Sequence, residues 1–121
     1  VDAMAISIGN VHLQQDAGQG LDLDRLRAIE ALTPVPLVIH GGSGVPTAER
    51  AALAATSHIC KFNIGTELRM VFGSALRAAL ARDPSQFDRI EILRATEAPM
   101  TAAAQVVIRN LGAHSQAEAA G

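Results

Sequence analysis

Residues 36–46 read PLVIHGGSGVP, an apolar segment that ends in a histidine and passes at once into a glycine-rich turn. A short apolar run opened by a proline is typical of a strand buried on both faces, as in a parallel sheet. After the turn, Thr47 is expected to cap a helix, because its hydroxyl can accept from the first-turn amides of Glu49 or Arg50. The segment therefore places the imidazole of His40 and several backbone amides at the carboxyl end of a strand, where α/β proteins bind ligands.

Two further apolar runs, one before and one after this segment, predict two more strands. They occupy residues 3–8 and 59–64, and each of the three predicted strands is followed along the chain by a helical pattern. A strand–helix unit repeated three times predicts parallel strands joined by right-handed crossovers. The helices are expected at about residues 23–32, 47–56 and 67–81.

The helix expected at residues 67–81 carries an apolar stripe that fits one buried face. Further helix is expected over residues 90–111, divided at Pro99, because a proline is tolerated only in the first turn of a helix. Glu30 is expected on the solvent side of the first helix, and the small, polar tail from Gly112 onward is expected to fray. The stripe consists of Leu68, Val71, Phe72, Ala75, Leu76, Ala79 and Leu80.

The composition of the chain argues against several classes of partner. The 121 residues carry a net charge of −2 with both signs interspersed, which disfavours nucleic acid and anionic membrane surfaces. No apolar run reaches the roughly 18 residues that span a bilayer, and no basic-then-apolar leader opens the chain. The three phenylalanines are the only aromatic residues, too few for a base-stacking platform. The single cysteine, Cys60, excludes an internal disulfide framework, so we expect a cytoplasmic protein.

Two histidines follow predicted strands at their carboxyl ends, His12 after the first and His40 after the second. Because one helix lies between these strands, the two imidazoles are expected to project from neighbouring strands into one space. Neutral imidazole is a good zinc ligand, and a catalytic zinc typically takes three protein ligands. The spacing alone also allows two ordinary loop histidines, so at this point a metal site is one of two interpretations.

Two loops are candidate anion sites. The turn at residues 41–44 can bind an anion through its backbone amides, although a tight turn into the next helix explains it better. Residues 63–66 join a strand to the positive end of a well-formed helix, where free amides can point at a phosphate; the alternative is an ordinary connection. His58 and Cys60 lie at the opposite, amino end of the third strand, and we interpret both as structural.

Three ordered blocks of the chain resemble the carboxy-terminal part of class II (zinc-dependent) ketose-bisphosphate aldolases, of which the fructose- and tagatose-bisphosphate enzymes are familiar members. The blocks are IGNVH at residues 8–12, PLVIHGGSGVP at 36–46 and KFNIGTELR at 61–69. The resemblance implies an α/β fold made of the last three strand–helix units of a (β/α)8 TIM barrel plus C-terminal helices. Residues 1–121 would then form one partial barrel domain that lacks the N-terminal strands.

The same resemblance implies roles for individual residues. His12 and His40 would be ligands of Zn²⁺, which acts as a Lewis acid in the reversible aldol cleavage of a ketose 1,6-bisphosphate to dihydroxyacetone phosphate and an aldehyde. The implied partners are the phosphorylated ketose and, in the complete enzyme, other copies of the chain in a homo-oligomer. The residues implied to hold dihydroxyacetone phosphate are Gly41, Gly42, Ser43, Asn63, Ile64, Gly65 and Thr66.

Two features depart from the family pattern. The family's first-block histidine is usually followed by a glycine whose backbone helps to hold the phosphate, whereas Leu13 follows His12 here. The family's Asp-His pair, which supplies the proton-transferring carboxylate and another zinc ligand, belongs to an earlier strand, so no catalytic residue is assigned within this chain. A three-stranded piece of a barrel also exposes strand edges. The alternative function is therefore an inactive remnant, or one part of a split barrel that assembles with another chain.

His40-Gly41-Gly42 after a strand also resembles the oxyanion-hole segment of esterases. An α/β-hydrolase needs a downstream G-x-S-x-G elbow at a strand-to-helix turn. The closest candidate, Gly73-Ser74, falls inside a helical pattern, so we reject this alternative.

Overall fold

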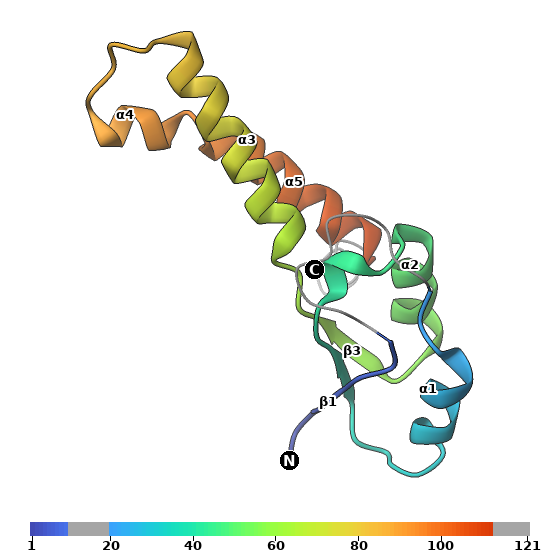
Figure 1. Cartoon of the computed structure of the whole chain (residues 1–121). Helices are drawn as coiled ribbons and strands as arrows, with labels where there is room; N and C mark the ends of the chain where they lie inside the picture. The colour runs from blue at the N-terminus through green and yellow to red at the C-terminus, as the bar shows by residue number, and fades with distance from the viewer. Residues whose placement is uncertain (10–19, 113–121) are drawn as a thin grey trace, which may run out of the picture.

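The computed structural model describes residues 1–9 and 20–112, so that His12 and Leu13 lie outside the described residues, as does the tail after Gly112. The three strands form one parallel sheet in the order β1-β2-β3 (Figure 1). Parallel neighbours need a crossover between them, and α1 and α2 supply it. The elements are β1 (Met4–Ile6), α1 (Leu23–Glu30), β2 (Leu37–Ile39), the 3₁₀ turn η1 (Gly42–Gly44), α2 (Thr47–Thr56), β3 (Ile59–Phe62), α3 (Thr66–Arg82), α4 (Arg89–Arg94) and α5 (Glu97–Asn110).

The central strand β2 is buried along its whole length, as its apolar sequence predicts. The outer strands are shorter than expected: β1 buries only Ile6, and β3 ends at Phe62. Hydrogen bonding between the segments that contain β2 and β3 nevertheless continues beyond the ends of these two strands. The amide of Asn63 donates to the carbonyl of Ile39 at 2.9 Å, and the amide of Gly42 donates to the carbonyl of Asn63 at 3.0 Å. The loops that leave β2 and β3 are therefore tied together at the carboxyl edge of the sheet.

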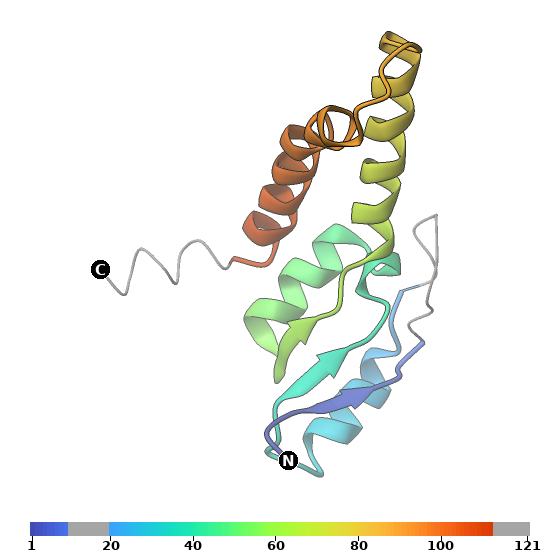
Figure 2. The same ribbon diagram turned by 90° about the vertical axis from the view of Figure 1, so that its left-hand side faces the viewer.

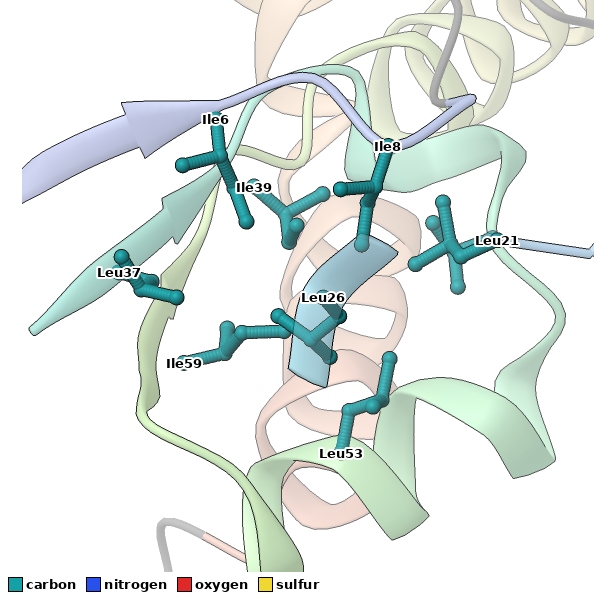
Figure 3. Close-up of a cluster of buried hydrophobic side chains, with 9 residues drawn as sticks. Ile6, Ile8, Leu21, Leu26, Leu37, Ile39, Leu53 and Ile59 are labelled. Carbon is teal, nitrogen blue, oxygen red and sulfur yellow. The ribbon is translucent and has the colours of Figure 1, made fainter. Parts of the chain in front are cut away.

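The hydrophobic core lies between the sheet and two helices, as Figure 3 shows. Leu26 of α1 and Leu53 of α2 pack against the strand side chains, of which Leu37 and Ile39 are completely buried. Burying one such aliphatic side chain stabilises the fold by about 1.5–3 kcal/mol. This packing fixes α1 and α2 on one face of the sheet and so holds the carboxyl ends of β2 and β3 in place. The buried cluster consists of Ile6, Ile8, Leu21, Leu26, Leu37, Ile39, Val45, Leu53 and Ile59.

The stripe of α3 is not the buried face that the sequence predicts. No residue of α3 is fully buried, and Phe72 and Leu80 expose 36% and 42% of their surface. The reason is that α3 packs along α5 rather than on the sheet. Figures 1 and 2 show the two helices running side by side away from the sheet, with α4 at the far end. One helix partner covers only part of an apolar stripe, so the rest stays half-exposed.

The expected cap on α2 is also wrong. The helix spans the predicted residues, but Thr47 is already its first helical residue and Pro46 occupies the cap position without a side-chain hydrogen bond. A capping residue must keep an extended backbone, and Pro46 does so with φ −53° and ψ 140°. Because Thr47 is one position too late, its hydroxyl does not cap the helix.

Glu30 differs from its expected solvent position as well. It is half-buried at the end of α1, and its Oε1 atom accepts a hydrogen bond of 2.6 Å from the amide of His58. The carboxylate thus satisfies a backbone donor at the amino end of β3. The helical periodicity predicts that this side chain lies on the polar face of α1. Its hydrogen bond to the amide of His58, from another element, holds it partly buried instead.

The carboxy-terminal helices divide as Pro99 predicts. It lies in the first turn of α5, where the missing amide of a proline costs nothing. The shorter α4 precedes it and is capped by Asp88, whose carboxylate accepts from the amide of Ile90 at 2.8 Å. Within residues 1–9 and 20–112, no helix combines the length and the apolar character that crossing a membrane requires.

Candidate active site

The carboxyl ends of β2 and β3 enclose an open concavity of about 500 Å³. Seven of the predicted site residues line it. Gly42 is buried and does not line the concavity, while His12 lies outside the described residues. The predicted residues that line the concavity are His40, Gly41, Ser43, Asn63, Ile64, Gly65 and Thr66.

The imidazole of His40 faces the carboxamide of Asn63 from the neighbouring loop. The Nδ2 atom of Asn63 lies 3.2 Å from Nδ1 and 3.4 Å from Nε2 of the exposed ring. The amide nitrogen thus lies within hydrogen-bond distance of both ring nitrogens. Because each residue directly follows a strand of the same sheet, the pairing depends on the register of β2 and β3.

Two glycines shape the turn that follows His40. Gly41 has φ +68°, a left-handed conformation that side chains other than glycine's rarely adopt. A Cβ atom on Gly42 would lie 3.4 Å from the carbonyl oxygen of Asn63 and equally close to the side chains of Phe62 and Ile64. The first glycine therefore allows the turn, and the second lies where the two loops pack closely together.

Ser43 joins this turn to the start of α3. Its Oγ atom accepts hydrogen bonds from the amide of Gly65 at 3.1 Å and from the amide of Glu67 at 3.4 Å. Two of the amides that the sequence offers to a phosphate are thus already engaged by a side chain. A hydroxyl that accepts in this way still has one proton to donate. Ser43 can therefore donate a hydrogen bond to a ligand while its oxygen accepts from the amides at the start of α3.

Arg69 also lines the concavity, although it is not among the site residues that the sequence predicted. It lies one helical turn beyond Gly65, and a Cβ atom on that glycine would be 3.9 Å from the guanidinium. The spacing of four residues at a helix start is the signal that could have found it. Its fixed positive charge adds to the positive end of α3, which favours an anion in this concavity.

The predicted zinc site can be examined only in part, because His12 lies outside the described residues. Across residues 1–9 and 20–112, no group of three or more His, Cys, Asp or Glu side chains is arranged to hold a metal ion. His40 itself suits the role of one ligand, because a neutral imidazole at an exposed loop position is a common zinc donor. A ligating histidine usually donates its other ring N–H to an oxygen, and Asn63 can present its Oδ1 after a flip of the amide.

His58 and Cys60 lie at the opposite edge of the sheet, away from the concavity. The amide of His58 donates to Glu30, and the Sγ atom of Cys60 contacts the carbonyl oxygen of Leu37 at 3.4 Å. These contacts link neighbouring elements at the amino ends of the strands. They agree with a structural role for both residues.

Comparison with known proteins identifies the family. A family model for class-II fructose-bisphosphate aldolases matches residues 1–116. The chain belongs to the class-II fructose-bisphosphate aldolase family. The crystal structure of the YdjI aldolase from Escherichia coli K12 is similar in fold, with a TM-score of 0.65 and 27% sequence identity over 92% of this chain. The chain covers 39% of the length of the YdjI chain.

The predicted family and the predicted fold are therefore both confirmed. Three parallel strands with their helices form a part of the (β/α)8 barrel of this aldolase family. In such barrels the active site lies at the carboxyl ends of the strands. The concavity between β2 and β3 occupies that edge of this sheet.

Proposed function

We propose that this chain carries the phosphate-binding side of an aldolase that reversibly cleaves a ketose 1,6-bisphosphate to dihydroxyacetone phosphate and an aldehyde. The family supports aldolase chemistry in general. One observation supports the more specific proposal: His40, Ser43 and the start of α3 border the same concavity. A metal-binding imidazole and an anion-binding helix start in one space suit a substrate that carries both a carbonyl and a phosphate.

The phosphate would lie against the loop that leads into α3. Thr66 is the first residue of this 17-residue helix, whose free amides and aligned peptide dipoles favour an anion. Ser43 can add a hydroxyl donor and Arg69 a positive charge. Gly65 leaves room for the phosphate, because among the described residues, apart from its chain neighbours, only the Arg69 guanidinium stands within 4 Å of where its side chain would begin.

Zinc would be held by His12 and His40 together with ligands from outside this chain. When bound, the metal would act as a Lewis acid toward the oxygens of the ketose phosphate. Within the described residues, Asn63 would orient the imidazole of His40 and the glycine turn would keep it at the edge of the concavity. The carboxylate that moves the proton is expected from a strand that precedes these three.

The test of this proposal is an aldol-cleavage assay on the protein that carries these residues. Fructose and tagatose bisphosphates are supplied separately, and dihydroxyacetone phosphate is measured with and without a chelator. We expect metal-dependent cleavage of one of them. The 121-residue chain alone should show no appreciable activity, because the acid/base carboxylate and further metal ligands are expected elsewhere. Turnover by the isolated chain would contradict this assignment.

A second candidate is a role as a remnant or as one part of a split barrel. Within the described residues, β1 and β3 are both edge strands, and the chain covers 39% of the length of YdjI. Open edges tend to pair with other chains. A remnant should aggregate when expressed alone, whereas a split part should become soluble when expressed together with its partner.

We also propose a homo-oligomer as the state of the complete enzyme and the cytoplasm as its compartment. The arm formed by α3, α4 and α5 displays large apolar side chains, including Phe87 and Ile90, which expose 94% and 58% of their surface. Exposed apolar groups of this size are typical of a protein–protein contact. The single cysteine agrees with a reducing compartment.

A further inference from the structure

Arg50 of α2 is a cation buried at a junction between helices. Its side chain exposes 5% of its surface, and its guanidinium pairs with both carboxylate oxygens of Glu67, at 2.7 Å from Oε1 and 3.3 Å from Oε2. The Nε atom of Arg50 is buried without a hydrogen-bond partner among the residues that the structure describes. A buried charge of this kind depends heavily on its one bidentate partner.

Glu67 lies in the first turn of α3, two residues after Gly65. Its own amide donates to Ser43, the same hydroxyl that holds the amide of Gly65. The pair with Arg50 thus fixes the turn from which the proposed phosphate site is built. Without the guanidinium, a partly buried carboxylate would stand unneutralised at the helix start that is meant to attract an anion.

The pair itself does not face the concavity. Arg50 and Glu67 line a separate cavity of about 250 Å³ on the side of α3 that packs against α5, together with Val107 and Asn110. A ligand in the concavity between β2 and β3 therefore would not touch the guanidinium. Any influence of Arg50 on such a ligand must pass through Glu67 and the first turn of α3.

We propose that Arg50 is a positioning residue for the phosphate loop and acts by clamping and neutralising Glu67. This inference rests on the proposed function, because it assigns the phosphate to the loop at residues 63–66. Arg50 makes the start of α3 rigid and keeps its net field favourable to an anion. It thereby sets substrate affinity rather than the chemical step.

The test uses the protein that carries these residues and compares Arg50→Met with the double variant Arg50→Met/Glu67→Gln. Inorganic phosphate is the probe, with its Kd measured by calorimetry, and kcat and KM are measured with the bisphosphate. We expect Arg50→Met to weaken phosphate binding by about tenfold and to raise KM with little change in kcat. The double variant should recover most of the affinity, because no unpaired carboxylate remains.

Two further variants separate positioning from simple loss of stability. Arg50→Lys keeps the charge but loses the bidentate geometry, so it should bind phosphate more tightly than Arg50→Met and more weakly than the unmodified protein. Arg94→Met removes an arginine that pairs with Glu91 on α4, far from the concavity, and should leave Kd and KM unchanged. Phosphate binding by Arg50→Met that equals the unmodified protein's would overturn the inference, as would a double variant no better than the single one.

Amide hydrogen exchange keeps the inference testable without phosphate. Arg50→Met should speed exchange at the amides of Gly65 and Glu67 by about tenfold relative to Arg94→Met. If the unmodified protein fails to bind phosphate, the proposed function fails, and faster exchange at these two amides still supports the clamp. Equal exchange in the two variants overturns it.

Discussion

The hydroxyl oxygen of Ser43 lies 3.1 Å from the amide nitrogen of Gly65 and accepts its hydrogen bond. This contact joins the turn after β2 to the helix start after β3. It also explains how two short loops, neither of them long enough to form a pocket alone, make one concavity at the edge of the sheet. The polar groups that face a ligand there belong to both loops.

The first prediction concerns Gly65→Val. The added side chain would point toward the guanidinium of Arg69 and fill the space that we assign to the phosphate. We expect KM for the bisphosphate to rise by about tenfold or more while zinc content, measured by atomic absorption, stays the same. A phosphate ligand soaked into crystals should appear beside Gly65 and Ser43. Density for it near His58 instead would refute the assignment.

The second prediction concerns the metal. Replacing His12 or His40 with alanine should abolish zinc retention and turnover, since each substitution would remove one of the proposed zinc ligands. His58→Ala is the matched control, because only the backbone amide of His58 engages Glu30 and the substitution preserves it. Zinc content after dialysis is the measurement. Equal zinc in all three variants would remove the metal hypothesis.

The third prediction concerns stability in the arm. Gly73 lies inside α3, and among the residues that the structure describes, apart from the helix's own backbone, a Cβ atom there would meet only the movable guanidinium of Arg77, at 3.4 Å and beyond. Gly73→Ala should raise the free energy of unfolding by about 0.5–1 kcal/mol, measured by urea denaturation. Gly41→Ala, at φ +68°, should lower it by about 1–2 kcal/mol. Stabilisation by both substitutions would contradict the difference that we infer between the helical backbone at Gly73 and the left-handed backbone at Gly41.

The fourth prediction concerns pH. Hydrogen bonds from the hydroxyl and amide of Ser85 hold the pKa of the Asp83 carboxyl below its ordinary value. A depressed folded-state pKa contributes stability above the unfolded pKa, and this contribution is lost as the pH falls through the folded one. Ser85→Ala should move the titration midpoint of Asp83 upward, as followed by carboxyl ¹³C NMR. Ser74→Ala, on an exposed face of α3, should leave the midpoint where it is.

Much of this architecture was predictable from local sequence. The unbroken apolar run of β2 indicated a strand buried on both faces, and Leu37, Val38 and Ile39 are all buried. The bounds of α2 and the division of the carboxy-terminal helices at Pro99 were predictable from helix-breaking residues. Such residues act on the backbone of only one or two neighbouring positions. The glycine turn and the KFNIGTELR block both predict a site at the carboxyl edge of the sheet, because parallel strands share one carboxyl edge, and the structure brings these residues together around one concavity.

The strand–helix order, the family and the edge at which a site is expected thus all follow from the sequence. The tertiary structure alone decided which partner each face meets. Periodicity reports that the face of α3 is apolar, but only packing shows that α5 covers it in part. In the same way, Arg50 and Glu30 look like ordinary surface charges until folding brings Glu67 and the amide of His58 beside them. A charge is buried when a distant residue compensates it, and such a partner cannot be found in a local pattern.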